Sequence, residues 1–134
     1  MSGYDTEALT EGQLGALIEI MFLAAFADGE FSTQEQANFR EVVSRLGDSR
    51  LTSDVLSGLM LRAAVQLERE GRGARLVAAR TELQDQDARR IALALAADVA
   101  GADGIESRER EQLKETAKAL EISESELERL VGQA

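Results

Sequence analysis

Four residues between Ala27 and Glu35 have the types and the spacing of a cation-binding loop. In the second half of a calcium-coordinating loop, an Asp-Gly pair is followed by an apolar residue two positions on, and then by a Glu that holds the ion with both carboxylate oxygens. The same intervals are occupied here by Asp28, Gly29, Phe31 and Glu35. Histidine and cysteine are absent from the chain, so a bound metal would be held by oxygen atoms, which favours calcium, magnesium or manganese.

The Asp-Gly feature occurs a second time, after a second alanine-rich segment. Asp103 follows Asp28 by 75 residues, and after a one-residue gap Glu109 follows Glu35 by 74 residues. The apolar residues that come next match in the same register, as Phe39 with Leu113, Val43 with Ala117 and Leu46 with Leu120. We therefore expect two helix–turn–helix repeats, over about 14–47 and 88–121, packed about a pseudo-twofold axis with their first helices side by side.

A regular EF-hand site is excluded by the rest of the loop. Its first and third positions need oxygen ligands, and counting back from the first Asp-Gly pair places Ala24 and Phe26 there. In the second copy the same positions hold Val99 and Gly101. The shorter spacing of that copy also puts Arg110 where the bidentate Glu belongs.

Helix capping explains part of the same sequence without a metal. Gly29 and Gly104 suit the left-handed residue that ends a helix, and Ser32 to Glu35 form a capping box for the next one. The two Asp residues are explained less well, because a carboxylate at the C-terminal end of a helix faces the negative end of its dipole, at a cost of about 0.3–1 kcal/mol. If the repeats bring both turns together, they form an acidic cluster that a divalent cation would neutralise. The candidate metal ligands are Asp28, Glu35, Asp103 and Glu109.

The elements that must position these acids are helices. Apolar residues recur at helical intervals along the chain, and no segment alternates like a strand. With 134 residues, 44% apolar residues and no proline, the sequence predicts one all-α domain over 1–134, a compact bundle of about seven helices. Caps and glycine breakers place them at about 11–28, 33–46, 53–70 and 74–83, then from a cap at Asp85 or Asp87 to about 100, at 107–120 and at 124–131, with Thr52 or Ser53 as the cap of the third.

Two of these helices are expected at the centre, since the first and the fifth are apolar almost all round. The third should turn six apolar residues inward: Val55, Leu56, Leu59, Met60, Ala63 and Leu67. The stretch 62–90 holds seven Arg against five acids, which we interpret as a solvated helical face, with a partner-docking edge as the alternative.

Charge and composition exclude several classes of function. The net charge of −10 repels phosphate groups, which argues against nucleic acid as a partner. The acidic N-terminus lacks the layout of a signal peptide and no apolar run has membrane-spanning length, so we expect a cytoplasmic chain without direct membrane insertion. Without histidine or cysteine there is no Ser-His or Cys-His catalytic pair. An enzyme built on paired carboxylates is conceivable, but nothing in the sequence indicates a substrate cleft, and we expect no enzyme.

Two Ala-Asp-Gly turns with following acids, each after an alanine-rich helix, resemble the TerB-like family of bacterial proteins. The resemblance runs from about Leu14 to Val131 and is strongest in LALAADVAGADGIESREREQLKETAKALEISESELERL, residues 93–130. It implies a bundle of about seven helices with pseudo-twofold symmetry, and a role in tellurite resistance and stress response through protein complexes. It also implies a metal-binding role for Asp28 and Glu35 in the first copy and for Asp103 and Glu109 in the second, where the spacing departs from the family pattern by one residue.

Two hypotheses of function follow. In the first, the chain is a non-catalytic TerB-like domain that binds a divalent cation, calcium or magnesium, through its acidic turns and acts as an interaction module with proteins of a tellurite-resistance or stress complex. In the second, it is a purely structural protein–protein interaction domain without a metal, and the acidic turns are helix caps. The oligomeric state stays open.

Overall fold

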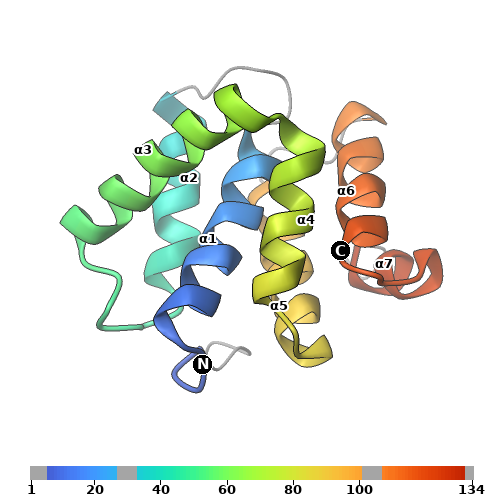
Figure 1. The fold of residues 1–134 in the computed structure, drawn as a ribbon, viewed down its shortest axis with the longest axis horizontal. Helices are drawn as coiled ribbons and strands as arrows, with labels where there is room; N and C mark the ends of the chain where they lie inside the picture. Colours follow the sequence, from blue (N-terminus) through green and yellow to red (C-terminus); the bar gives the residue numbers. More distant parts are fainter. Residues whose placement is uncertain (1–5, 27–32, 101–106, 132–134) are drawn as a thin grey trace.

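Seven helices make up most of the chain that the computed structural model describes, which comprises residues 6–26, 33–100 and 107–131 (Figure 1). No strand occurs within these ranges, so the predicted all-α bundle is confirmed. The helices are α1 (Glu11–Ala25), α2 (Thr33–Ser44), α3 (Ser53–Glu70), α4 (Arg72–Glu82), α5 (Gln86–Ala100), α6 (Ser107–Ala119) and α7 (Glu124–Val131).

The helices α1 and α5 pack side by side at the centre, as their composition predicts. Every residue of α1 from Leu14 to Ala25 is buried except Gly15, and every residue of α5 from Ala92 to Ala100 is buried except Asp98. A helix that is apolar all round has no face to offer to water, so other helices must enclose it. In this bundle α2, α3, α4 and α6 contact α1, and α2, α6 and α7 contact α5.

The two predicted repeats are α1–α2 and α5–α6. Their first helices are in contact, and each second helix touches both central helices. In Figure 1, α1 and α5 also run in the same general direction, so that their C-terminal ends lie at the same end of the bundle. This is the arrangement that a pseudo-twofold axis would produce, and the symmetry itself stays a prediction.

Side-chain caps start three of the helices, as the sequence predicts. Thr10 and Gln13 form a complete capping box for α1, with bonds of 3.1 Å and 3.0 Å. Thr52 accepts from the backbone of Val55 at the start of α3, and Ser123 accepts from Glu126 at the start of α7. These bonds satisfy backbone N–H groups that have no partner inside the helix.

Several boundaries and one inward residue differ from the prediction. Helix α1 ends at Ala25, before Gly29, which lies outside the described residues. The break after α3 is a single residue, Gly71, with φ +87°, while Gly73 belongs to the first turn of α4. Val55 is 46% exposed rather than inward, because it lies toward the N-terminal part of α1, where Gly12 and Gly15 leave room beside α3. Within the described ranges no helix combines the length and hydrophobicity needed to cross a bilayer.

Candidate functional site

The four predicted metal ligands are described to different extents. Asp28 and Asp103 lie outside the described residues, and Glu109 belongs to α6 without a described side chain. Glu35 is in the first turn of α2 and is half-buried. Among the described side chains, no group of three or more acids is placed so that it could hold a metal ion. The four-residue cluster therefore stays a prediction.

One hydrogen bond joins α2, in the first predicted repeat, to α5, in the second. The Asn38 side-chain nitrogen donates to the carbonyl oxygen of Val99 at 3.1 Å, so the second turn of α2 lies against the last turn of α5. Glu35 precedes Asn38 by three residues and shares its side of α2. Helix α2, which follows the first Asp-Gly pair in the sequence, is thus in contact with α5, which precedes the second Asp-Gly pair.

This end of α5 carries a further acid that the sequence analysis did not single out. Asp98 is exposed, yet the packing around its carboxyl partly desolvates it and raises its pKa, while the charge of Arg45 acts in the opposite direction. The last turn of α5 contains no basic residue, so Asp98 faces the negative end of the helix dipole without a cation in its own turn. A bound cation would lower the free energy of this arrangement.

The end of α1 has a cation from another helix. Arg72 of α4 donates through Nη1 to the carbonyl oxygen of Leu23 at 2.6 Å and forms an ion pair with Glu115 of α6 at 3.1 Å. Burial lowers the pKa of Arg72, and the charge of Glu115 partly offsets this. The Arg72 guanidinium satisfies a carbonyl that the helix leaves without a partner. Both central helices therefore have an arginine of another segment near their C-terminal ends, hydrogen-bonded to a carbonyl at α1 and acting through its charge at α5.

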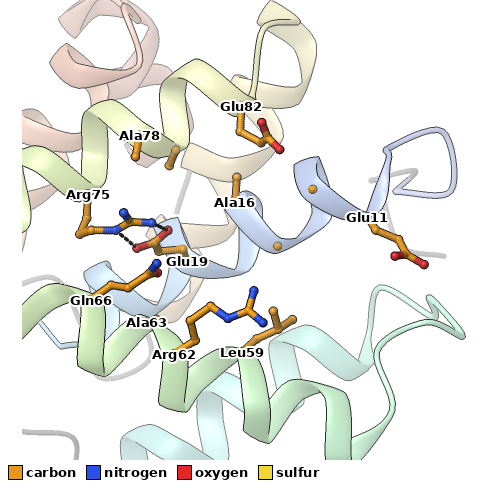
Figure 2. A pocket seen from close by; sticks show the side chains of 13 residues that line it. Glu11, Ala16, Glu19, Leu59, Arg62, Ala63, Gln66, Arg75, Ala78 and Glu82 are labelled. Carbon is orange, nitrogen blue, oxygen red and sulfur yellow. Dashed lines mark hydrogen bonds and ion pairs between the residues drawn. The ribbon is translucent and has the colours of Figure 1, made fainter.

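A polar groove lies on the other side of α1, where α3 and α4 form its walls (Figure 2). It has a volume of about 300 Å³, and the small residues Gly12, Gly15 and Ala16 of α1 form its floor. A Cβ atom at Gly12 would lie 2.3 Å from Glu82 Oε1, so the glycine lets this carboxylate rest against the first turn of α1. The N-terminal end of a helix attracts negative charge, which explains this position of Glu82.

The inner end of the groove is closed by a nearly buried ion pair. Arg75 of α4 donates through Nε and Nη2 to the two carboxylate oxygens of Glu19 of α1, at 2.7 Å and 2.9 Å (Figure 2). Arg75 also reaches Glu70 at 3.1 Å, and the bonds to Glu19 raise its pKa. Two parallel bonds fix both the distance and the orientation of the two helices.

The arginines of 62–90 are therefore not all on a solvated face, and that interpretation is wrong for three of them. Arg72, Arg75 and Arg89 have side chains that are 13–18% exposed. Arg72 and Arg75 join α4 to α6 and α1, and Arg89 joins α5 to α4 and to the turn after α6. Arg62 does extend into the groove from α3 (Figure 2), and it forms no ion pair with another described residue. The groove thus presents a free guanidinium on one wall and a carboxylate, that of Glu82, on the other.

The lining of this groove is charged and polar, with small apolar side chains between the charged groups. Its lining residues include carboxylates, guanidinium groups, one amide and small apolar side chains, and among them there is no hydroxyl, thiol or imidazole that could act as a nucleophile or a base near neutral pH. One feature of the sequence indicates this groove, namely two glycines in the first helix. Gly12 and Gly15 interrupt an apolar helix three residues apart, which places them on one face and leaves a shallow floor.

A second ionic contact holds the N-terminal segment beside the groove. Arg50 donates to Asp48 and to the carbonyl oxygens of Leu9 and Thr6, at 2.7–3.0 Å. The Arg50 guanidinium, with a further bond from the Thr6 hydroxyl, holds the pKa of Asp48 well below its usual range. Asp48 is nearly buried, so these bonds replace its water.

Comparison of the chain with models of protein families, with curated proteins and with solved structures found no match in any of the three.

Proposed function

We propose that this chain is a non-catalytic, TerB-like interaction module of a bacterial tellurite-resistance or stress system, and that the end where α1 and α5 terminate binds a divalent cation. The ligands we propose are Glu35, Asp103, Asp28 and Glu109, with calcium or magnesium as the ion. The observation that carries the proposal is the hydrogen bond from Asn38 to Val99, which joins the beginning of α2 to the end of α5.

Electrostatics supports the cation at this end of the bundle. Asp98 lies in the last turn of α5, its carboxyl is partly desolvated, and Asp103 follows five residues later in the sequence. Carboxylates that gather at the negative end of a helix dipole repel one another, and hard cations such as calcium and magnesium bind such oxygen ligands. A cation would join the two repeats through charge as Asn38 joins them through a hydrogen bond.

The alternative is an interaction domain without a metal. It is favoured by Arg72, which already provides a positive charge at the end of α1, so that Asp28 there would serve as a turn and capping residue. In this alternative Asp28 contributes to stability, and calcium and magnesium have no effect on the protein.

Calorimetric titration with CaCl₂ and with MgCl₂ separates the two. We expect saturable binding by the wild type, and at least tenfold weaker binding by Asp103→Asn and by Glu35→Gln. Asp54→Asn is the matched control, because Asp54 is an exposed acid in the first turn of α3. Equal behaviour of all four proteins, or no heat at millimolar cation, would leave the metal-free interaction domain as the function.

The groove between α1, α3 and α4 is where we place the protein-interaction part of this function. It is open, and Arg62 and the carboxylate of Glu82 face it from opposite walls, Arg62 forming no ion pair with another described residue. Charges fixed at opposite walls orient a polar segment of a partner and repel a segment whose charges have the wrong sign. This placement predicts that Arg62→Glu abolishes capture of a partner that Arg69→Glu still captures, since Arg69 is an exposed arginine of the same helix.

A further inference from the structure

The outer side of α3 exposes two large apolar residues one helical turn apart. Leu61 is 68% exposed and Val65 is 42% exposed, on the side opposite the buried residues Leu56, Met60 and Ala63. Single exposed apolar side chains are common and need no explanation. Helix α3 lies at the edge of the bundle (Figure 1). Two exposed apolar residues in one row on it form a surface that a second protein could cover.

The row continues in both directions along α3 and has an acid at one end and an arginine at the other. Asp54, Gly58, Leu61, Val65 and Arg69 follow one another at intervals of three or four residues and so share one side of α3. Asp54 and Arg69 are exposed and form no ion pair with another described residue. A Cβ atom at Gly58 would have no neighbour within 4 Å, so the surface is open at this point and carries no side chain.

This row is complementary to itself when a second copy is turned to run antiparallel. With a twofold axis at the level midway between Leu61 and Arg62, each residue of the row lies at the level of the residue whose number adds with its own to 123, and the two copies of Leu61 lie side by side at the axis. Asp54 then faces Arg69 of the second copy, and Gly58 faces Val65 of the second copy. Each pair occurs twice, as in any isologous interface. Opposite charges meet at both ends, and the Val65 side chain enters the space that Gly58 leaves.

We propose that this side of α3 is a self-association surface, on which a second copy of the chain packs its own α3 antiparallel. The position in the molecule agrees with the charge. At a net charge of −10 two copies repel each other, and the contact is least costly where acids are fewest. Residues 55–67 of α3 contain no acid. Helix α3 has 18 residues and is about 27 Å long. One such helix pair buries less than a standard interface of about 1,200–2,000 Å², so the dimer is weak and reversible.

Analytical ultracentrifugation at increasing protein concentration, in about 0.15 M salt, tests the proposal. We expect a monomer–dimer equilibrium for the wild type and a monomer for Leu61→Glu. Val77→Glu is the matched control, because Val77 of α4 is a large apolar residue outside the row that is 48% exposed, between Val65 and Leu61. Thermal unfolding followed by circular dichroism shows whether each variant remains folded, as exposed positions should.

A charge exchange tests the register itself. Asp54→Arg and Arg69→Asp, each alone, place like charges opposite each other twice, and each should weaken the dimer by about tenfold. In a mixture of these two variants, every Arg faces an Asp, so the mixed dimer should regain the wild-type affinity. The proposal is overturned by a wild type that stays monomeric at 1 mM, by equal effects of Leu61→Glu and Val77→Glu, or by a mixture that associates no better than its components.

Discussion

The ion pair between Glu19 and Arg75 provides the sharpest test of how the groove is built. The Glu19 side chain is 10% exposed and the Arg75 side chain 13%, and two bonds of 2.7 Å and 2.9 Å join them. Arg75→Met removes the cation and leaves a carboxylate inside the bundle between α1 and α4. Removing one partner of a buried pair costs about 3–5 kcal/mol. We expect a value of about 3 kcal/mol, because both side chains keep some contact with water.

The assay is equilibrium unfolding in urea, followed by circular dichroism. In a domain of 134 residues this loss corresponds to a fall of about 10 °C in the melting temperature. Replacing both partners, as Glu19→Met with Arg75→Met, removes the buried charge and should restore stability to within about 1 kcal/mol of the wild type. Glu70→Gln is the control, since this second partner of Arg75 is 45% exposed and contributes less than about 1 kcal/mol. A single Arg75→Met variant that loses less than 1 kcal/mol would refute the view that this pair is desolvated.

Three further predictions concern the helix ends and the N-terminal contact. Gly71 has φ +87°, a conformation that other residues adopt at a cost of about 1–3 kcal/mol, so Gly71→Ala should lower the unfolding free energy. Gly73→Ala, in the open first turn of α4, should raise it by up to about 1 kcal/mol, and the opposite order would contradict the break at Gly71. Thr10→Ala should cost about 1 kcal/mol through loss of the capping box, and Thr10→Ser much less; equal losses would show that the hydroxyl is not what matters. The pKa of Asp48 is depressed on folding, so its contribution to stability is present above its unfolded pKa and is lost as the pH falls toward its folded pKa. Urea unfolding between pH 5 and pH 2 should therefore show a steeper loss of stability for the wild type than for Asp48→Asn, and parallel curves would rule out this role.

The helices and their central pair could be predicted because their signals are local. Thr10, Thr52 and Ser123 cap the helices that follow them, and the absence of polar residues around α1 and α5 requires that both be enclosed. Boundaries such as the end of α1 at Ala25 were harder to predict from the sequence, because apolar residues continue beyond the point where the helix ends. The sequence does not encode a helix end as strongly as a helix start.

The contacts between helices could not be predicted from spacing alone. Arg75 pairs with Glu19 across 56 positions, and Arg72 reaches the carbonyl of Leu23 across 49. The residues next to an arginine in the sequence do not show whether it is paired inside the bundle or lies on a solvated face. The composition of 62–90 therefore predicted a solvated face for Arg72 and Arg75, and this was wrong for both. The groove was missed for a similar reason, since its floor, Gly12 and Gly15, becomes a feature only when α3 and α4 are placed around it.

The central claim, that the two repeats meet in one acidic cation site, is tested most directly with Mn²⁺. This ion takes the same oxygen ligands as calcium and magnesium, and its paramagnetism broadens the amide resonances of nearby residues in a ¹H–¹⁵N spectrum. We predict that resonances over 28–35 and over 98–109 broaden together at substoichiometric Mn²⁺, and that both sets stay sharp in Asp103→Asn. Broadening of one set alone, or equal broadening in wild type and variant, would contradict a shared site.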